Sequence, residues 1–307
     1  MTHAPNVNVF VREMVTNIGW RVAETTTSMD AALNIIRTGK ASLIILDDNI
    51  AEPVSFLMRR LIGDPLGVLT PTIALVLEQN RREAEALSRM GKPEVIPHPL
   101  SVGAFAPRLR GLLKRWEVPF MESCRQAAGL VILGKVETGL RMLTQLNNSD
   151  PPSSLPTQAL AYFYRQLKEH RTAEKILLAA LQKSPTDLGC IFSLSDLYLH
   201  SAMPGYALKL LSGAATAFST SLTLLPDLVE ACVMLGRLDE AIVYLYRMHD
   251  ADFLGSFTQN YLVRLLLAEG RDQEVGRLAA RRRELTLRTM KTWSDFETPA
   301  ATNAAAS

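Results

Sequence analysis

Residues 160–185 read LAYFYRQLKEHRTAEKILLAALQKSP, and three of their positions recur at a fixed step of 34 residues. Two of these positions hold mostly small residues, and the third holds mostly leucine. The three columns are Ala127, Ala161, Ser195, Val229 and Val263; Gly139, Ala173, Ala207, Ala241 and Val275; and Leu143, Leu177, Leu211, Leu245 and Ala279. Three columns in one register indicate paired helices that stack into a superhelix, an architecture that usually binds other proteins.

The ends of the expected helices carry their own signals. Gly134, Gly236 and Gly270 share one position of the register, where a first helix should end in a left-handed cap. Pro185 should stop a second helix, because proline cannot continue one. Pro226 falls inside the expected first helix of the fourth pair, so that helix should begin there, with the proline in its first turn.

These motifs resemble the tetratricopeptide repeat family. The residues that carry the resemblance are Leu160-Ala161-x-x-Tyr164, Ala173-Glu174-x-x-Leu177 and Gly236-Arg237-Leu238-Asp239-Glu240-Ala241. The resemblance covers roughly 120–289, with departures at Gly139 and Arg282, and implies an α-solenoid of about five helix pairs. It also implies a concave groove, lined by the first helix of each pair, that suits an extended peptide or a partner helix. On the family pattern the groove residues are Tyr162, Arg165, Gln166, Phe192, Asp196, His200, Glu230, Asn260 and Arg264.

The first 117 residues have a different pattern, in which short apolar runs alternate with helical periodicity. Such alternation predicts an α/β domain with a parallel sheet. The predicted strands are 20–24, 42–47, 72–77 and 95–97. The predicted helices are 5–18, 29–38, 53–63, 79–90 and 101–116.

The same segment resembles response-regulator receiver domains, through Ile18-Gly19-Trp20-Arg21-Val22, Leu43-Ile44-Ile45-Leu46-Asp47 and His98-Pro99-Leu100. The resemblance implies a flavodoxin-like sheet with strand order 2-1-3-4-5 and places Asp47 on the phosphoacceptor, with Asp48 as the fallback. The rest of the family's site is altered. Val76 stands at the hydroxyl position, and His98 with Pro99 stands at the lysine and proline positions. The acid pair that would hold Mg²⁺ falls near Thr2 and His3, which are not carboxylates.

The first strand of the receiver pattern, which would be the central one, has no counterpart in the chain. Three explanations stay open: a strand with the acid pair encoded upstream of Met1, a strand formed by residues 6–11, or a strand supplied by a partner chain. We favour the first. We expect Mg²⁺ to bind only if this upstream strand with its acid pair exists. Without it we expect neither a metal nor another cofactor.

Composition narrows the remaining classes of function. The net charge of +2 gives no reason to expect nucleic-acid binding. Cys124, Cys190 and Cys232 are far apart in helical patterns and should be reduced and buried. No signal segment or membrane-spanning run is seen, so we expect a cytoplasmic protein without membrane insertion. The expected organisation is a receiver-like domain over 1–117, a helical repeat domain over 118–297 and a disordered tail over 298–307.

The sequence therefore predicts a non-enzymatic bacterial signalling adaptor. Its receiver-like domain would remain unphosphorylated, because losing the metal and a fixed donor removes most of the stabilisation that phosphoryl transfer needs. That domain would dock or form a homodimer through about 79–116, and the repeats would hold a second protein. The alternative is a true response regulator in which a histidine kinase leads to phosphorylation of Asp47 and the repeats form the output.

Overall fold

The computed structural model describes residues 5–17, 19–22, 24–39, 41–48, 54–77, 93–116, 119–149, 153–218, 222–251 and 255–280. The predicted helix at 79–90, residues 79–92 of the predicted docking face at 79–116, and the predicted tail at 298–307 lie outside these residues. None of the described helices is long and apolar enough to cross a membrane.

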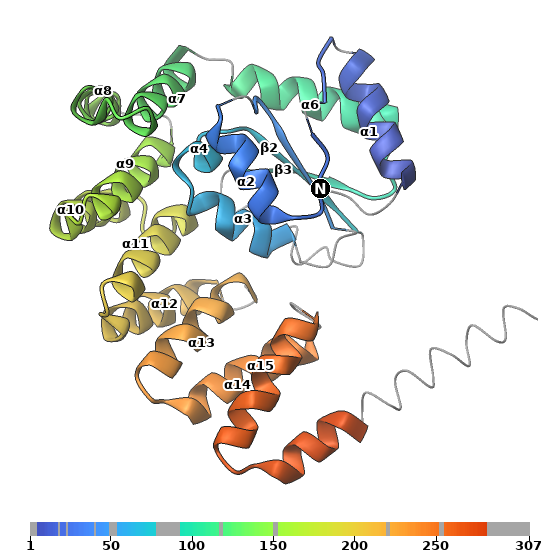
Figure 1. Ribbon diagram of the computed structural model, residues 1–307, viewed down its shortest axis with the longest axis vertical. Coiled ribbons are helices and arrows are strands. Elements are labelled where there is room, and N and C mark those ends of the chain that lie inside the picture. Colours follow the sequence, from blue (N-terminus) through green and yellow to red (C-terminus); the bar gives the residue numbers. More distant parts are fainter. Residues whose placement is uncertain are drawn as a thin grey trace, which may run out of the picture.

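The N-terminal part contains a small parallel sheet with helices packed around it (Figure 1). Its strands are β1 (Ile44–Asp47), β2 (Thr72–Val76) and β3 (Pro93–Pro97), which pair in chain order. Its helices are α1 (Pro5–Asn17), α2 (Met29–Arg37), α3 (Val54–Ile62), α4 (Pro65–Val68) and α6 (Val102–Trp116). β2 lies between the other two strands and all of its residues are buried, which explains why it reads as a continuous apolar run.

One expectation for this part is wrong, and one of the three open explanations for the missing strand is excluded. Residues 20–22 and 24 adopt irregular backbone, so the structure does not support a strand at 20–24. Residues 6–11 lie in α1, where Phe10 packs edge-on against Phe105 of α6 at a centroid distance of 5.9 Å, and so cannot supply the missing strand. Their apolar residues follow a helical period, which outweighs the short stretch of β-branched residues. Before Ile44 the described residues contain no strand, and the five-strand receiver sheet is not seen in them.

The C-terminal part consists of antiparallel helix pairs. They are α7 (Pro119–Ile132) with α8 (Val136–Asn148), α9 (Leu155–Gln166) with α10 (His170–Lys183), α11 (Leu188–His200) with α12 (Pro204–Ala217), and α13 (Leu225–Met234) with α14 (Leu238–Asp250). A short 3₁₀ turn, η2 (Leu222–Leu224), precedes α13. α15 (Gly255–Ala268) is followed by helical residues 272–280.

The small-residue columns mark the contacts between paired helices, as predicted. Ala127, Ala173 and Ala207 have no exposed surface. At Gly139, a Cβ atom would lie 2.5 Å from a methyl carbon of Val131 and 2.6 Å from the carbonyl oxygen of Ala127. Glycine is therefore the residue that lets α8 approach α7 so closely, and the departure from alanine at this position has a structural reason.

The turn between the helices of a pair repeats the same backbone conformation five times. Gly134, Gly236 and Gly270 have φ of 85°, 70° and 67°, which confirms the predicted left-handed caps. Lys168 and Ala202 occupy the same register position and are also left-handed, with φ of 61° and 54°. The geometry of the hairpin imposes this conformation even where the residue has a Cβ, and the sequence pattern alone did not reveal these two positions.

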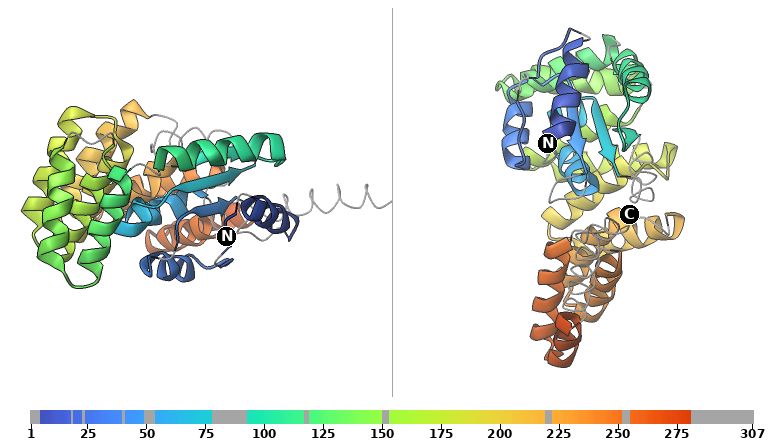
Figure 2. Two further views of the ribbon diagram at one scale, coloured as in Figure 1. Left: turned by 90° about the horizontal axis from the view of Figure 1, so that it is seen from above. Right: turned by 90° about the vertical axis from the view of Figure 1, so that its right-hand side faces the viewer.

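The α/β part lies on the inner side of the arc formed by the helix pairs (Figures 1 and 2). α4 packs against α7 and α9, and α3 packs against α11. All of α4 is buried, although residues 64–68 lie between the predicted helix at 53–63 and the predicted strand at 72–77. The apolar core continues from Met14 to Leu278 without a break at the predicted domain boundary after residue 117.

Candidate functional site

The carboxyl end of β1 holds the residues expected from the receiver resemblance. Asp47 is 1% exposed, and its Oδ1 atom lies 3.2 Å from Nε2 of His98. Asp48 faces the backbone instead, where its Oδ2 atom accepts a hydrogen bond from the amide of Leu77 at 3.2 Å. Asp47 and His98 therefore lie together, in a contact that is largely closed to solvent.

The other receiver-site positions are less suited to phosphate. Val76 is buried in β2 and has no polar side-chain atom, and Pro99 is exposed after β3. Thr2 and His3 lie outside the described residues. Within the part of the chain that the structure describes, no group of three His, Cys, Asp or Glu side chains could hold a metal ion.

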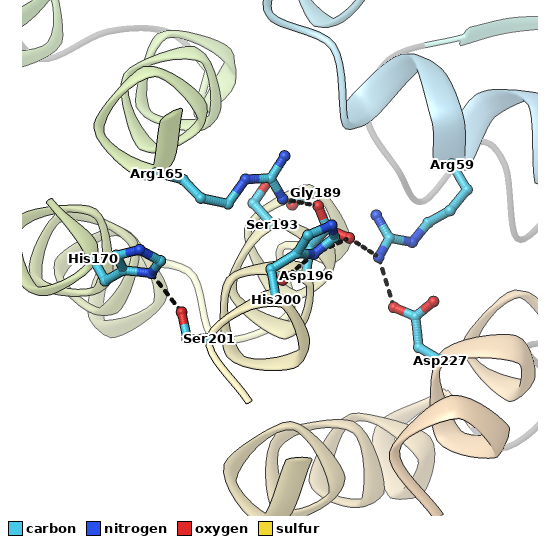
Figure 3. A network of polar contacts seen from close by, with 9 residues as sticks. All are labelled: Arg59, Arg165, His170, Gly189, Ser193, Asp196, His200, Ser201 and Asp227. Carbon is cyan, nitrogen blue, oxygen red and sulfur yellow. Dashed lines mark hydrogen bonds and ion pairs between the residues drawn. The ribbon is translucent and has the colours of Figure 1, made fainter. Parts of the chain in front are cut away.

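The first helices of the pairs, α7, α9, α11 and α13, together with α15, form a surface that we call the inner wall. A second polar site lies on this wall, where the Arg59 side chain extends from α3 (Figure 3). Its Nη2 atom lies 2.7 Å from Oδ2 of Asp227 on α13 and 3.5 Å from Oδ1 of Asp196 on α11. The guanidinium carbon also lies 4.6 Å above the centre of the Phe192 ring, in a cation–π contact. The Arg59 side chain is 15% exposed, so the α/β part places a cation inside the wall.

Asp196 is the centre of this network. It also forms an ion pair with Arg165 of α9, and His200 Nδ1 lies 3.8 Å from its Oδ1 atom. Burial would raise the pKa of Asp196, but the charges of Arg59 and Arg165 outweigh burial and hold that pKa below its ordinary value. The carboxylate is therefore stabilised in its charged form. Its two guanidinium partners come from different parts of the molecule.

The predicted groove residues divide into two groups. Those on α9 and α11 mostly lie against the chain's own α/β part: Phe192 is fully buried, Asp196 holds Arg59, and Arg165 stacks 5.2 Å from the centre of the Tyr162 ring. The pKa of Tyr162 is raised by burial and by the nearby charge of Asp64. The exposed residues of the predicted set are Gln166, His200, Glu230, Asn260 and Arg264.

Sequence reasoning missed three features of this wall: Arg59, Asp227 and the buried helix α4. Arg59 lies in Arg59-Arg60, which resembles an ordinary solvated end of a helix. Asp227 stands 34 residues after Ser193, so the register could have placed it on the wall. The position of α4 depends on contacts between distant segments, which a local pattern does not record.

No family model matches the chain, and no similar protein is found among the curated proteins. Among solved structures the chain is similar to MamA MSR-1 at 18% identity, with 56% of this chain and 99% of that chain covered and a TM-score of 0.39. It is also similar to TTC0263, a thermophilic TPR protein in Thermus thermophilus, at 19% identity, 58% and 99% coverage and a TM-score of 0.38. The described helices between residues 119 and 280 stack as hairpins through their own contacts, in a 34-residue register.

Proposed function

We propose that this chain is a non-enzymatic scaffold that binds another protein on the open half of its inner wall. The observation that carries the proposal is that the other half already binds polypeptide, because α3 and α4 of the same chain pack against α7, α9 and α11. The wall continues beyond them onto α13 and α15, where Glu230, Asn260 and Arg264 are exposed. A concave helical surface with mixed polar and apolar side chains suits an extended peptide or a partner helix.

Apolar side chains on this open half support the proposal. Met234, four residues after Glu230 on α13, is 45% exposed, and Leu267 on α15 is 51% exposed. Large apolar side chains exposed next to charged ones are typical of surfaces that bind a partner. The second view in Figure 2 shows α14 and α15 extending away from the α/β part.

The test of this proposal uses the full chain as bait in extracts of its native host, with captured proteins identified by mass spectrometry and then purified. Their affinity for the full chain is compared with that for Arg264→Glu, on the open wall, and Arg247→Glu, on the outer helix α14. Both arginines are exposed, and neither forms an ion pair with a described residue. Affinity should fall with Arg264→Glu alone. Equal affinities for both variants would refute the open wall as the binding surface.

We further propose that the chain acts as a signalling adaptor whose α/β part remains unphosphorylated. Supporting observations are the low exposure of Asp47 and its contact with His98 where the receiver pattern has lysine. Incubation with acetyl phosphate and Mg²⁺, followed by Phos-tag electrophoresis, should give no shifted band. A shifted band that disappears in Asp47→Ala would instead establish a response regulator acting through this aspartate.

A further inference from the structure

The inner wall presents equivalent positions at successive repeats. Asp196 on α11, Glu230 on α13 and Arg264 on α15 are each 34 residues apart. Because each repeat has the same hairpin geometry, side chains in one column project from the wall at equivalent positions. Asp196 and Glu230 are therefore two copies of one wall position, and both carry a carboxylate.

The first copy is already occupied by cations. Arg59 and Arg165 both form ion pairs with Asp196, and the Phe192 ring supports the Arg59 guanidinium from one side. Figure 3 shows the two arginines approaching this carboxylate from opposite sides. The molecule thus displays how this wall position binds a guanidinium group.

The second copy has no such partner. Among the described residues none forms an ion pair with Glu230, and its side chain is exposed. The charged groups near Glu230 include the carboxylates of Asp196 and Asp227, the guanidinium groups of Arg59 and Arg165, and His200, whose Nδ1 atom lies 3.8 Å from Asp196. Without a proton on His200, these groups and Glu230 together carry three negative charges against two positive ones. Although Glu230 is exposed, the neighbouring protein removes part of its hydration, and this partial burial and the charges of Asp227 and Asp196 raise its pKa despite the opposing charges of His200 and Arg59. The site therefore favours an added positive charge.

We propose that the partner of the open wall binds through an arginine or lysine side chain that pairs with Glu230. This proposal rests on the proposed function and specifies the chemistry of the partner. Met234, one helical turn along the same face of α13 from Glu230, offers an exposed apolar surface to the methylene stem of such a side chain. A cation bound there would balance the charge of the network, as Arg59 does one repeat earlier.

The test selects displayed random peptides on the immobilised full chain, with Glu230→Gln as the counter-target. Glu269→Gln is the matched control, because Glu269 is an exposed acid in the turn after α15. Selected peptides are then synthesised with fluorescein, and their affinities are measured by anisotropy at low and high salt. Because Glu230 is exposed, thermal unfolding should show that its substitution leaves the fold intact.

The expected result is enrichment of one basic residue among peptides selected on the wild-type chain, and its loss on Glu230→Gln. Affinity should fall about tenfold with Glu230→Gln, remain unchanged with Glu269→Gln, and weaken as salt rises. Selected peptides without a basic preference, or ones that bind Glu230→Gln equally well, would overturn this inference while leaving the scaffold function intact. Failure to select any peptide would count against both proposals.

Discussion

The two halves of the inner wall have the same hairpin geometry but different surroundings. On α7, α9 and α11 the wall is covered by α3 and α4, and Phe192 at its centre is fully buried. On α13 and α15 the equivalent surface carries exposed Glu230 and Arg264. The comparison teaches that register determines where side chains are presented, whereas tertiary contacts decide which of them remain available to a partner. The covered half also shows that the wall can bind helices, because α3 and α4 pack against it.

Removal of the Arg59 side chain should have the largest effect on this comparison. Arg59→Ala leaves Asp227 and Asp196 without a shared cation in a site with little solvent, which should lower the free energy of unfolding by about 3 kcal/mol. The matched control is Arg60→Ala, because Arg60 pairs with the exposed Asp30 and should contribute less than about 1 kcal/mol. Urea denaturation measures both. Similar losses for the two variants would mean that the contact with the wall adds little to stability.

A smaller effect tests what both halves share, the close packing of paired helices. Gly139→Ala places a Cβ atom 2.6 Å from the carbonyl oxygen of Ala127, which the backbone must move to avoid. We expect a loss of about 2 kcal/mol. Gly129→Ala on the adjacent helix α7 meets no heavy atom within 4 Å and should instead stabilise the protein by about 0.5 kcal/mol. Thermal unfolding of the two variants should therefore shift in opposite directions.

The hairpin turns provide a still smaller contrast between the halves. Ala202 adopts its φ of 54° at a cost in backbone strain, whereas Gly236 adopts a φ of 70° without it. Ala202→Gly should raise stability by about 1 kcal/mol, and Gly236→Ala should lower it by a similar amount. Differential scanning calorimetry can measure both shifts. A decrease in stability for Ala202→Gly would show that loss of the methyl group outweighs relief of strain.

The smallest expected effect is a difference in pH dependence between the equivalent carboxylates. The pKa of Asp196 is held below 3.8 in the folded protein, so its contribution to stability is present above pH 3.8 and is lost as pH falls through the folded value. The pKa of Glu230 is raised above 4.5, so ionisation of Glu230 reduces stability as pH rises from 4.5 through its folded value. Free energies of unfolding over this acid range should become flatter above pH 4.5 in Glu230→Gln. If the free energy of unfolding of Glu230→Gln fell with pH above 4.5 as steeply as that of the wild type, Glu230 would not be the source of this pH dependence.

Much of the fold could be predicted because its signals are local or periodic. The predicted helices at 5–18, 29–38, 53–63 and 101–116 correspond to α1, α2, α3 and α6 within about two residues at each end. The start of α13 beside Pro226 and the end of α10 before Pro185 were also predicted, because proline restricts both ends of a helix. The repeat register identified the small residues where paired helices meet.

The covering of the wall could not be predicted, because no local signal records it. Pro65 and Gly67 suggest a loop, and their segment becomes a buried helix because Leu66, Val68 and Leu69 find an apolar surface on the repeats. Arg59 and Arg60 are adjacent in the sequence, but Arg59 pairs with Asp227 of the wall whereas Arg60 pairs with Asp30. Phe192 and Asp196, which the register assigns to the groove, contact Arg59 of α3. Their contacts with α3 required knowledge of the tertiary structure.

The seating of α4 against both α7 and α9 has a consequence for how this protein could lengthen by duplication. A hairpin inserted between α8 and α9 would rotate and displace α7 relative to α9, and α4 could no longer contact both helices. A hairpin added after α14 would leave the contacts of α4 with α7 and α9 unchanged. Related chains with different numbers of hairpins should therefore vary at the α15 end, and each added pair would lengthen the surface on which new ligand specificity can arise.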